Sequence, residues 1–439
     1  MQILGSFRNI FKIAELRKRI LFTFGVLIVY RLGAHIPLPG INPIAIDAFK
    51  EQFGGEQIFN IMQIFSGFAL GNLALFSLGI MPYITASIIM QLLTKVSPKV
   101  EAIAKEGPSG QRKIQQYTRY VTIPIAIVQG FFAVKALTAF SSRVPLFDQT
   151  GGTTLLLMLG LLGGALFIMW LGEQITEHGI GNGASVLIMA GIVSRMPAVA
   201  LNLIAKVREN EVPGEYLLLI SILYVGAIFA VVFVTQAQRR IPLQHAKHIR
   251  GRRMMSGGRN YLPLRVNTAG VMPVIFASSL LIIPYALSQI PGFGILVDIF
   301  ARGSFFYAVF FAAMIYFFTY FWTYLFFQPN EIANNLKEYG SFIPGIRPGE
   351  NTANYINTIL SRVTLCGATF LCIIALIPDM VSAGMGSAIQ TALLTFLGGT
   401  GILIVVGVSL DITQKMESYL LMHHYSGFVG SSGIRGRKG

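Results

Sequence analysis

The chain has 439 residues, of which 54% are apolar and 12% are charged, and its formal net charge is +15 at pH 7. The charged fraction is about half that of an ordinary soluble domain, and the apolar residues gather into runs of about 18 to 23 residues, the length of a helix that crosses a bilayer. This composition excludes one large soluble core and predicts a polytopic α-helical membrane protein.

Ten runs with few or no charges are predicted to be membrane-spanning helices. The first run follows a basic stretch that ends at Arg19, and because no convincing cleavage site comes after it, we interpret it as a retained span rather than a signal peptide. The ten runs are Ile20–Pro37, Leu73–Leu93, Val121–Phe140, Thr154–Leu171, Ala184–Ile204, Tyr216–Thr235, Ala269–Gln289, Phe305–Phe327, Thr358–Ile377 and Ala388–Leu410.

Positive charges between the runs predict the orientation of the chain. About 26 of the 34 lysines and arginines lie in the N-terminal segment, in the alternate loops on its side and in the C-terminal tail, and cytoplasmic loops carry such an excess. Both termini are therefore predicted to be cytoplasmic. The short connection from Gly172 to Gly183 departs from this rule, because it contains Glu173 and Glu177 but no lysine or arginine.

The runs divide evenly about the polar segment Glu209–Pro213, which predicts an N-terminal half at 1–208 and a C-terminal half at 209–439. Two halves of similar length are typical of an inverted five-helix repeat, although the two share no convincing residue-level similarity. Between the first two runs, Gln57–Asn72 is apolar but too short and too polar to cross a bilayer. It is predicted to be either a re-entrant plugging segment or an amphipathic helix in the interface.

Motifs for catalysis or metal binding are missing from the sequence. Cys366 and Cys372 lie in one apolar run without metal-ligand spacing, and there is no HExxH, G-x-S-x-G or complete P-loop. The glycine-rich string at Gly179 to Ser185 has no preceding strand and is interpreted as a tight turn. We therefore expect no enzyme activity, no metal and no cofactor, so the energy for any transport must come from a partner.

Five long strings, spread from one end of the chain to the other, resemble the bacterial SecY family (SecY/Sec61 alpha). They are LGIMPYITASIIMQLL (Leu78–Leu93), KEGPSGQRKIQQYTRY (Lys105–Tyr120), WLGEQITEHGIGNGAS (Trp170–Ser185), LPLRVNTAGVMPVIFASS (Leu262–Ser279) and FIPGIRPGENTANYI (Phe342–Ile356). The resemblance covers essentially the whole chain.

The resemblance implies an all-α fold of ten transmembrane helices, in two pseudo-symmetric inverted halves around a central pore, with a short re-entrant plug helix. It implies a channel in the bacterial cytoplasmic (inner) membrane that passes unfolded secretory chains across and releases membrane-protein segments sideways into lipid. Implied partners are the SecE and SecG subunits, the SecA ATPase, the ribosome, signal peptides, nascent chains and membrane lipids.

Six positions match the family's pore ring. Ile80 and Ile84 lie four residues apart, hence on one helical face, and such a pair read alone is usually simple packing. A collar of branched aliphatic side chains wets poorly, yet it can close around a passing chain without specific bonds. Ala184 departs from the pattern because the other five positions are isoleucine. Either the Leu187 side chain extends into the ring in its place, or the ring has five effective members. By resemblance the ring is Ile80, Ile84, Ala184, Ile188, Ile275 and Ile404.

The plug and the lateral gate also rest on the resemblance. Phe68 stands where a second glycine is usual, and a fixed apolar loop is the alternative to a mobile plug. Polar groups at the lateral gate have ordinary interhelical hydrogen bonds as their alternative explanation. The plug residues are Phe59, Ile61, Met62, Ile64, Phe65, Ser66 and Gly67, and the gate residues are Thr85, Gln91 and Ser279.

Two cytoplasmic loops, at about 236–265 and 328–356, are predicted to bind SecA or the ribosome. Phosphate-rich RNA would bind a dense basic loop without reading bases, whereas topology and lipid headgroup contact are the ordinary explanation. For Arg347, in a turn stiffened by Pro and Gly, a salt bridge to Glu350 is the alternative. The predicted docking residues are Arg239, Arg240, Lys247, Arg250, Arg252, Arg253 and Arg347.

An ion-coupled secondary transporter is the alternative function, because ten helices in two halves suit both classes. Such transporters usually bury carboxylates or histidines at the midplane. The middle of every predicted span here lacks Asp, Glu and His, which favours a protein-conducting channel.

Overall fold

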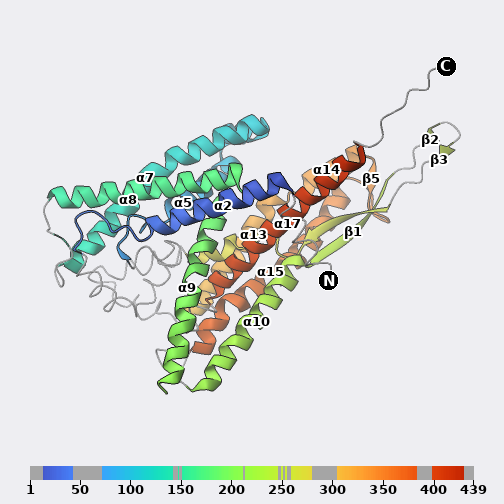
Figure 1. Ribbon diagram of the computed structural model, residues 1–439. Helices are drawn as coiled ribbons and strands as arrows, with labels where there is room; N and C mark the ends of the chain where they lie inside the picture. The colour runs from blue at the N-terminus through green and yellow to red at the C-terminus, as the bar shows by residue number, and fades with distance from the viewer. Residues whose placement is uncertain are drawn as a thin grey trace. The chain divides into compact units, whose positions relative to one another are not determined.

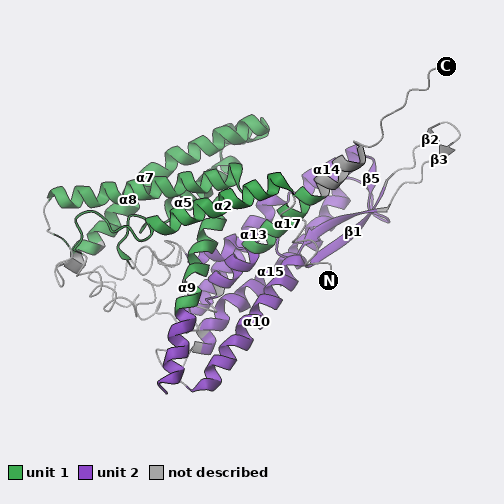
Figure 2. Cartoon of the chain, viewed as in Figure 1, with its two compact units in different colours: residues 1–198, 408–439 green, residues 199–407 purple. Residues whose placement is uncertain are grey.

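The computed structural model describes residues 13–42, 72–141, 147, 151–210, 213–245, 249–250, 253–254, 259–278, 304–382 and 398–429. The chain forms two compact units (Figure 2). Unit 1 contains Met1–Ala198 and Val408–Gly439, and unit 2 contains Val199–Gly407. The unit boundaries fall inside two helices, α9 (Gly183–Arg208) and α17 (Gly399–Val429). The predicted division into halves at 208 and 209 stays a prediction.

Unit 1 is built from long helices that pack side by side. α5 (Met81–Val96) packs against α7 (Pro108–Ser141), α7 against α8 (Gly151–His178), and α2 (Ala14–Gly33) against α8 (Figure 1). The short α6 (Pro98–Lys105) joins α5 to α7. Leucine, valine and phenylalanine side chains from α7, α8 and the segments beside α2 and α5 form a shared apolar core, which includes Leu38, Leu73, Val134 and Leu157.

The second predicted span begins later than its hydropathy indicates. The helix starts at Met81 rather than Leu73, because Leu73 and Gly79 both take a positive φ, of 44° and 59°, which a helix does not permit. The backbone of Leu73 instead pairs with Leu38, whose N–H donates to the Leu73 carbonyl oxygen at 2.9 Å. Pro82 then occupies the first turn of α5, where its missing N–H costs nothing.

Unit 2 combines helices with a small sheet. α13 (Phe305–Phe326) runs along α15 (Glu350–Ser382), and α10 (Gly214–Gln236) also contacts α15. The Tyr316 hydroxyl lies 2.7 Å from Thr369 Oγ1, and Tyr320 donates to the Ser361 carbonyl oxygen at 3.2 Å, so two tyrosines join α13 to α15. Residues 272–278 are also helical.

The basic segment that was predicted as a loop contains a β-hairpin. β1 (Gln238–His245) pairs antiparallel with β4 (Arg259–Arg265), and β5 (Ser341–Phe342) adds to the other edge of β1. The two-residue strands β2 (Ile249–Arg250) and β3 (Arg253–Met254) pair beyond it. Ile241 and Leu243 alternate with exposed residues and bury one face of the hairpin, which is the period of a half-buried strand.

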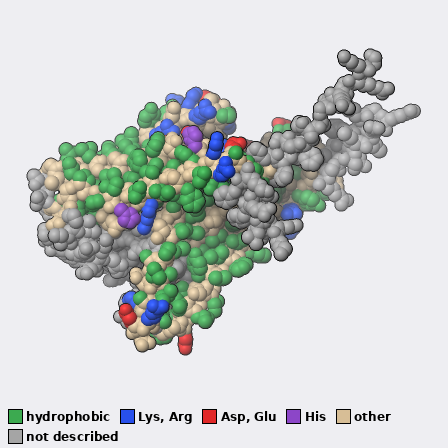
Figure 3. Space-filling view, viewed as in Figure 1, with side chains coloured by type: hydrophobic (Ala, Val, Ile, Leu, Met, Phe, Trp, Pro, Cys, Tyr) green, Lys and Arg blue, Asp and Glu red, His purple; other side chains and the backbone are tan. Residues whose placement is uncertain are grey.

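Five helices of the described ranges are long and apolar enough to cross a membrane. Their surfaces remain apolar, as Phe229 and Phe233 on α10 show with exposed fractions of 73% and 78%. On the face drawn in Figure 3, hydrophobic side chains cover broad stretches, while charges gather in small groups. Such a surface requires lipid as its solvent. The five are Gly151–His178, Gly183–Arg208, Gly214–Gln236, Phe305–Glu338 and Glu350–Pro378.

Candidate functional site

Two predicted ring residues lie at the start of α5. Ile80 is the residue that precedes the first helical turn, and the Ile84 N–H donates to the Ile80 carbonyl oxygen at 3.1 Å. Both side chains are buried, with exposed fractions of 3% and 8%. Their four-residue spacing places them one above the other on a single face of the helix.

The next two predicted ring residues, Ala184 and Ile188, lie in the first turns of α9, and the start of this helix approaches Gly172 of α8, as Ile80 does. Ala184 is half-buried and Ile188 is buried. A Cβ atom built on Gly172 of α8 would lie 3.4 Å from Ile80 Cδ1 and 3.6 Å from the Ala184 nitrogen. Leu187 Cδ1 lies 3.6 Å from the same point, so this leucine packs into the crossing of α8 and α9.

The last two predicted ring residues belong to unit 2. Ile275 lies in the helical residues 272–278 and Ile404 in α17, and both are buried. A Cβ on Gly407 would lie 2.9 Å from Val271 Cγ2. The helices that carry Ile275 and Ile404 therefore touch within unit 2.

An ion pair that the sequence did not predict joins α7 to α8. Arg119 Nε donates to Glu173 Oε1 at 2.6 Å, and the side chains have exposed fractions of 41% and 6%. α8 continues to His178, so the predicted connection at Gly172 to Gly183 is mostly helix. Arg119 supplies the positive charge that this acidic segment lacks in its own sequence.

The described gate residues make local hydrogen bonds. Thr85 Oγ1 donates to the Met81 carbonyl oxygen at 3.0 Å, and Gln91 Nε2 donates to Ser87 Oγ at 3.2 Å. Both bonds lie within α5 rather than between helices. Ser279 and the whole predicted plug, including Phe59 and Gly67, lie outside the described residues.

The β1–β4 hairpin and the turn that carries Arg347 belong to one structure. Ile241, Leu243 and Leu264 of the hairpin share a buried cluster with Ile343 and Ile356, and side chains of α14 (Pro329–Glu338) pack against it. The two predicted docking loops are thus joined by a common apolar core. Sequence spacing alone did not indicate this, because the loops are separated by the α13 span.

Among the predicted docking residues, Arg239 and Arg240 are exposed on β1. Arg250 and Arg253 belong to β2 and β3, where the backbone alone is described, and Lys247 and Arg252 lie outside the described residues.

Arg347 is exposed in a turn of fixed backbone. Gly345 and Gly349 take φ values of 82° and 106°, and Thr352 Oγ1 donates to the Arg347 carbonyl oxygen at 2.9 Å. Positive φ at both glycines excludes most other residues there. Within the described part of the chain, no salt bridge joins Arg347 to Glu350. The alternative explanation of Arg347 as the partner of Glu350 is therefore not supported.

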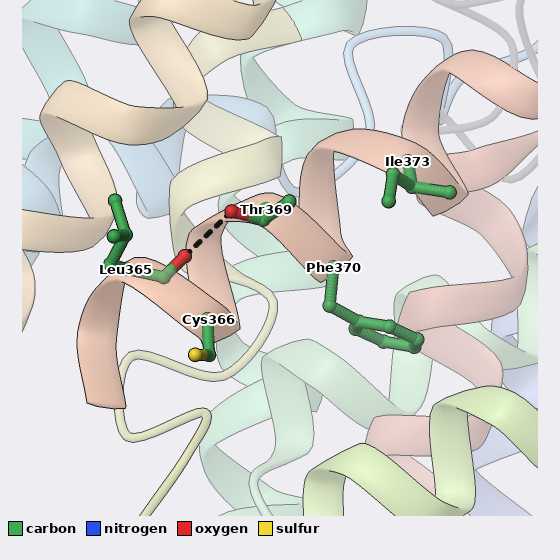
Figure 4. Close-up of a pocket in the computed structure, with 5 residues that line it drawn as sticks. All are labelled: Leu365, Cys366, Thr369, Phe370 and Ile373. Carbon is green, nitrogen blue, oxygen red and sulfur yellow. Dashed lines mark hydrogen bonds between the residues drawn. The ribbon is translucent and has the colours of Figure 1, made fainter. Parts of the chain in front are cut away.

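A shallow hollow on α15 offers no competing site. It is lined by Leu365, Cys366, Thr369, Phe370 and Ile373, all from one helix (Figure 4). Its hydroxyl group belongs to Thr369, which donates to the Leu365 carbonyl oxygen at 2.8 Å. The lining is otherwise apolar, as expected of a membrane-facing surface.

Comparison with known proteins gives consistent matches. The SecY family model matches residues 74–413. The chain is 41% identical to the protein translocase subunit SecY of Thermotoga maritima, over 99% of each chain, and 43% identical to that of Mycobacterium bovis, over 97% of this chain and 100% of the relative. A solved structure described as "The structure of a protein conducting channel" is similar with a TM-score of 0.59 and 19% identity, over 92% of each chain. Sec61 in the canine ribosome-channel complex from the endoplasmic reticulum is similar with a TM-score of 0.56 and 18% identity, over 92% of each chain.

Proposed function

The chain belongs to the SecY family, and on that premise we propose how its residues carry out the work of a protein-conducting channel. It is a multi-pass membrane protein and a channel subunit for polypeptide translocation, and its helical fold agrees with the ten-helix arrangement of the family. The resemblance that the sequence strings predicted is confirmed.

The predicted ring is our candidate for the pore constriction. The observation that supports it is that Ile80 Cδ1 and the Ala184 backbone nitrogen lie 3.4 and 3.6 Å from the position of a Cβ on Gly172, so that Ile80 and the start of α9 approach the same point of α8. Because aliphatic side chains offer no hydrogen bonds, a constriction made of them would resist water and ions but accept any sequence. By family resemblance the ring also includes Ile275 and Ile404, which belong to unit 2.

Crosslinking tests the ring directly. Photoreactive groups at Ile80, Ile188 and Ile404 are expected to crosslink to a secretory chain arrested in transit, whereas a group at Phe233, exposed on α10, is expected to contact lipid. Equal crosslinking from the ring positions and from Phe233 would refute the assignment.

The plug, the gate and the membrane topology remain proposals that rest on family membership and on charge. We propose the bacterial cytoplasmic membrane with both termini in the cytoplasm, following the excess of Lys and Arg in those segments. We propose SecE and SecG as companion subunits. We also propose that the segment around Ser66 closes the pore at rest, and that Thr85, Gln91 and Ser279 flank a lateral exit for signal peptides.

We propose the surface formed by the hairpin and the Arg347 turn as the docking site for SecA and the ribosome. Its support is the shared core that joins the two basic segments and the exposed guanidinium of Arg347. Arginine suits this task because its planar group binds carboxylate or phosphate through two hydrogen bonds.

Reversing the charge of Arg347 is expected to impair SecA-dependent export more than cotranslational insertion. Removing one charge-assisted contact costs about 1.5–3 kcal/mol, which is roughly 10- to 150-fold in affinity. The measurement compares Arg347→Glu with the parent in both assays. Arg208→Glu is the control, because Arg208 is exposed at the end of α9, on the predicted opposite side of the membrane. An equal loss in both assays would indicate a folding defect instead.

Charge reversal on the hairpin is expected to weaken ribosome binding through its salt dependence. If Arg239 contacts a phosphate, Arg239→Glu should reduce the slope of log affinity against log salt by about 0.7–0.9. Cosedimentation with ribosomes across a salt series measures this slope. An unchanged slope would place Arg239 outside the interface.

A secondary transporter is not favoured. The helices of a transporter would carry ionisable groups at the midplane, and the predicted spans lack carboxylates and histidines at their middles. The family is one of channel subunits rather than catalysts, and we propose that this chain has no catalytic activity of its own, so that SecA or the ribosome drives transport.

A further inference from the structure

We propose that Gly172, Thr176 and Gly183 form a lock between α8 and α9 that sets the position of Ala184 and Ile188. The lock is defined by these three residues. They would be positioning residues that act through the ring, so the inference rests on the proposed pore function and adds to it the device that holds two ring members in place.

The first part of the lock is steric. A Cβ atom on Gly183 would overlap the carbonyl oxygen of Gly172, and one on Gly172 would reach Ile80 Cδ1 at 3.4 Å. α8 and α9 therefore approach through their backbones at this point. Any side chain at Gly183 must push the first turn of α9, and with it Ala184, away from α8 and from Ile80.

The second part is a pair of hydrogen bonds through one hydroxyl. Thr176 Oγ1 donates to the Gly172 carbonyl oxygen at 2.9 Å and accepts a hydrogen bond from the Gly183 N–H at 2.9 Å. Gly183 is the first residue of α9, and the first N–H groups of a helix have no partner within it. Thr176 thus ties the start of α9 to the last turns of α8.

The turn between the two helices is held from its other side as well. Thr23 Oγ1 of α2 accepts a hydrogen bond from the Ile180 N–H at 3.2 Å, and Arg19 Nη1 donates to the Gly179 carbonyl oxygen at 3.4 Å. The Arg19 guanidinium also lies 5.2 Å from the ring centroid of Tyr419 in α17. Because α2 holds the turn through these hydrogen bonds and Gly181 lies against Ile412 of α17, we expect a shift at Gly183 to move α9 rather than the connection.

The packing of α8 against α9 also affects Ala184, the smallest residue of the proposed ring. Leu187 has an exposed fraction of 1% and lies in the crossing next to Gly172. The Leu187 side chain therefore packs against α8. The aliphatic contact at this level depends on where the backbone holds Ala184 and Ile188, which makes the lock more important than it would be with a larger residue at position 184.

The test measures backbone protection and pore closure in the same purified channel. Thr176→Val removes the hydroxyl but keeps the branched shape, and Thr176→Ser restores the hydroxyl. Hydrogen exchange by mass spectrometry follows the Gly183 amide, and planar bilayers report the conductance of the closed channel. We expect faster exchange and a severalfold rise in conductance for Thr176→Val, and parental values of both for Thr176→Ser.

A second pair of variants tests the steric part. Gly183→Ala is expected to raise closed-state conductance, whereas Gly163→Ala, in α8 and with open space around its Cβ, is expected to leave it unchanged. Equal effects of the two alanines, or unchanged Gly183 exchange in Thr176→Val, would overturn the lock.

Ile188→Lys separates the lock from the pore assignment. If Ile188→Lys leaks but Thr176→Val and Gly183→Ala do not, the ring stands and the lock is refuted. If Ile188→Lys does not raise the conductance of the closed channel, the ring assignment is wrong, and the inference about the lock is wrong with it.

Discussion

Replacing Ile188 with lysine is expected to raise the ion conductance of the closed channel at least about tenfold, since each 1.4 kcal/mol removed from the barrier to ion entry multiplies the flux by about ten. Ile188 is buried one turn into α9, and the collar that we propose there would resist water because its side chains are aliphatic. An ammonium group at this position must stay hydrated, so it brings water into the constriction.

Conductance in planar bilayers measures the effect, with the purified channel at rest. Ile188→Leu is the matched control, because it keeps an aliphatic side chain of equal size and should preserve the seal. A lysine variant that is folded and conducts like the parent would contradict the placement of Ile188 in the ring.

Removing Arg119 is expected to destabilise the channel more than removing Glu173. Arg119→Met leaves the Glu173 carboxylate buried without its partner, and breaking a buried pair in this way costs about 3–5 kcal/mol. Glu173→Leu leaves Arg119, whose exposed fraction of 41% lets water replace the lost contact, so its cost should be about 1 kcal/mol or less. The burial of the two partners, rather than the pair itself, decides the order.

Thermal unfolding of the purified channel in detergent measures both changes as shifts in Tm. The double variant Arg119→Met/Glu173→Leu should recover much of the loss, because it removes the stranded charge together with its partner. Equal destabilisation by the two single variants would show that burial does not set the cost.

Hydropathy predicted the helices best where the chain is uniformly apolar. The predicted runs Tyr216–Thr235 and Phe305–Phe327 agree closely with α10 and α13. The prediction that the second span begins at Leu73 was wrong, because hydropathy does not record the positive φ at Leu73 and Gly79, after which α5 begins. Hydropathy measures solvent preference and not backbone conformation.

The hairpin was missed although a signal was present. Ile241 and Leu243 are two residues apart and are flanked by Arg240 and Gln244, and this strand period was hidden by the many arginines around it. The positive charge predicted binding partners, whereas the two-residue spacing of the apolar side chains indicated the strand. Proline is unusual in strands, yet Pro242 of β1 pairs with Tyr261 and Pro263 of β4 pairs with Arg240.

Pairwise features of the candidate site depend on contacts that no sequence pattern contains. Arg119 and Glu173 are 54 positions apart, and the lack of lysine and arginine between Gly172 and Gly183 did not predict which residue would pair with Glu173. The position of Gly172 was likewise not predicted, because a glycine just after an apolar run gives no sign of which helix approaches it. The ring positions came from family resemblance rather than from physical patterns.

The turn that carries Arg347 leads into α15 without an intervening loop. α15 has 33 residues, which at 1.5 Å per residue is a rod about 50 Å long. The base of this rod is seated in the apolar core beneath the hairpin, through Ile356. A force applied at Arg347, in the docking surface that we propose, would therefore act on one end of α15, and the helix would pass the displacement along its length as far as Pro378, where a proline removes a backbone hydrogen bond and bends the helix.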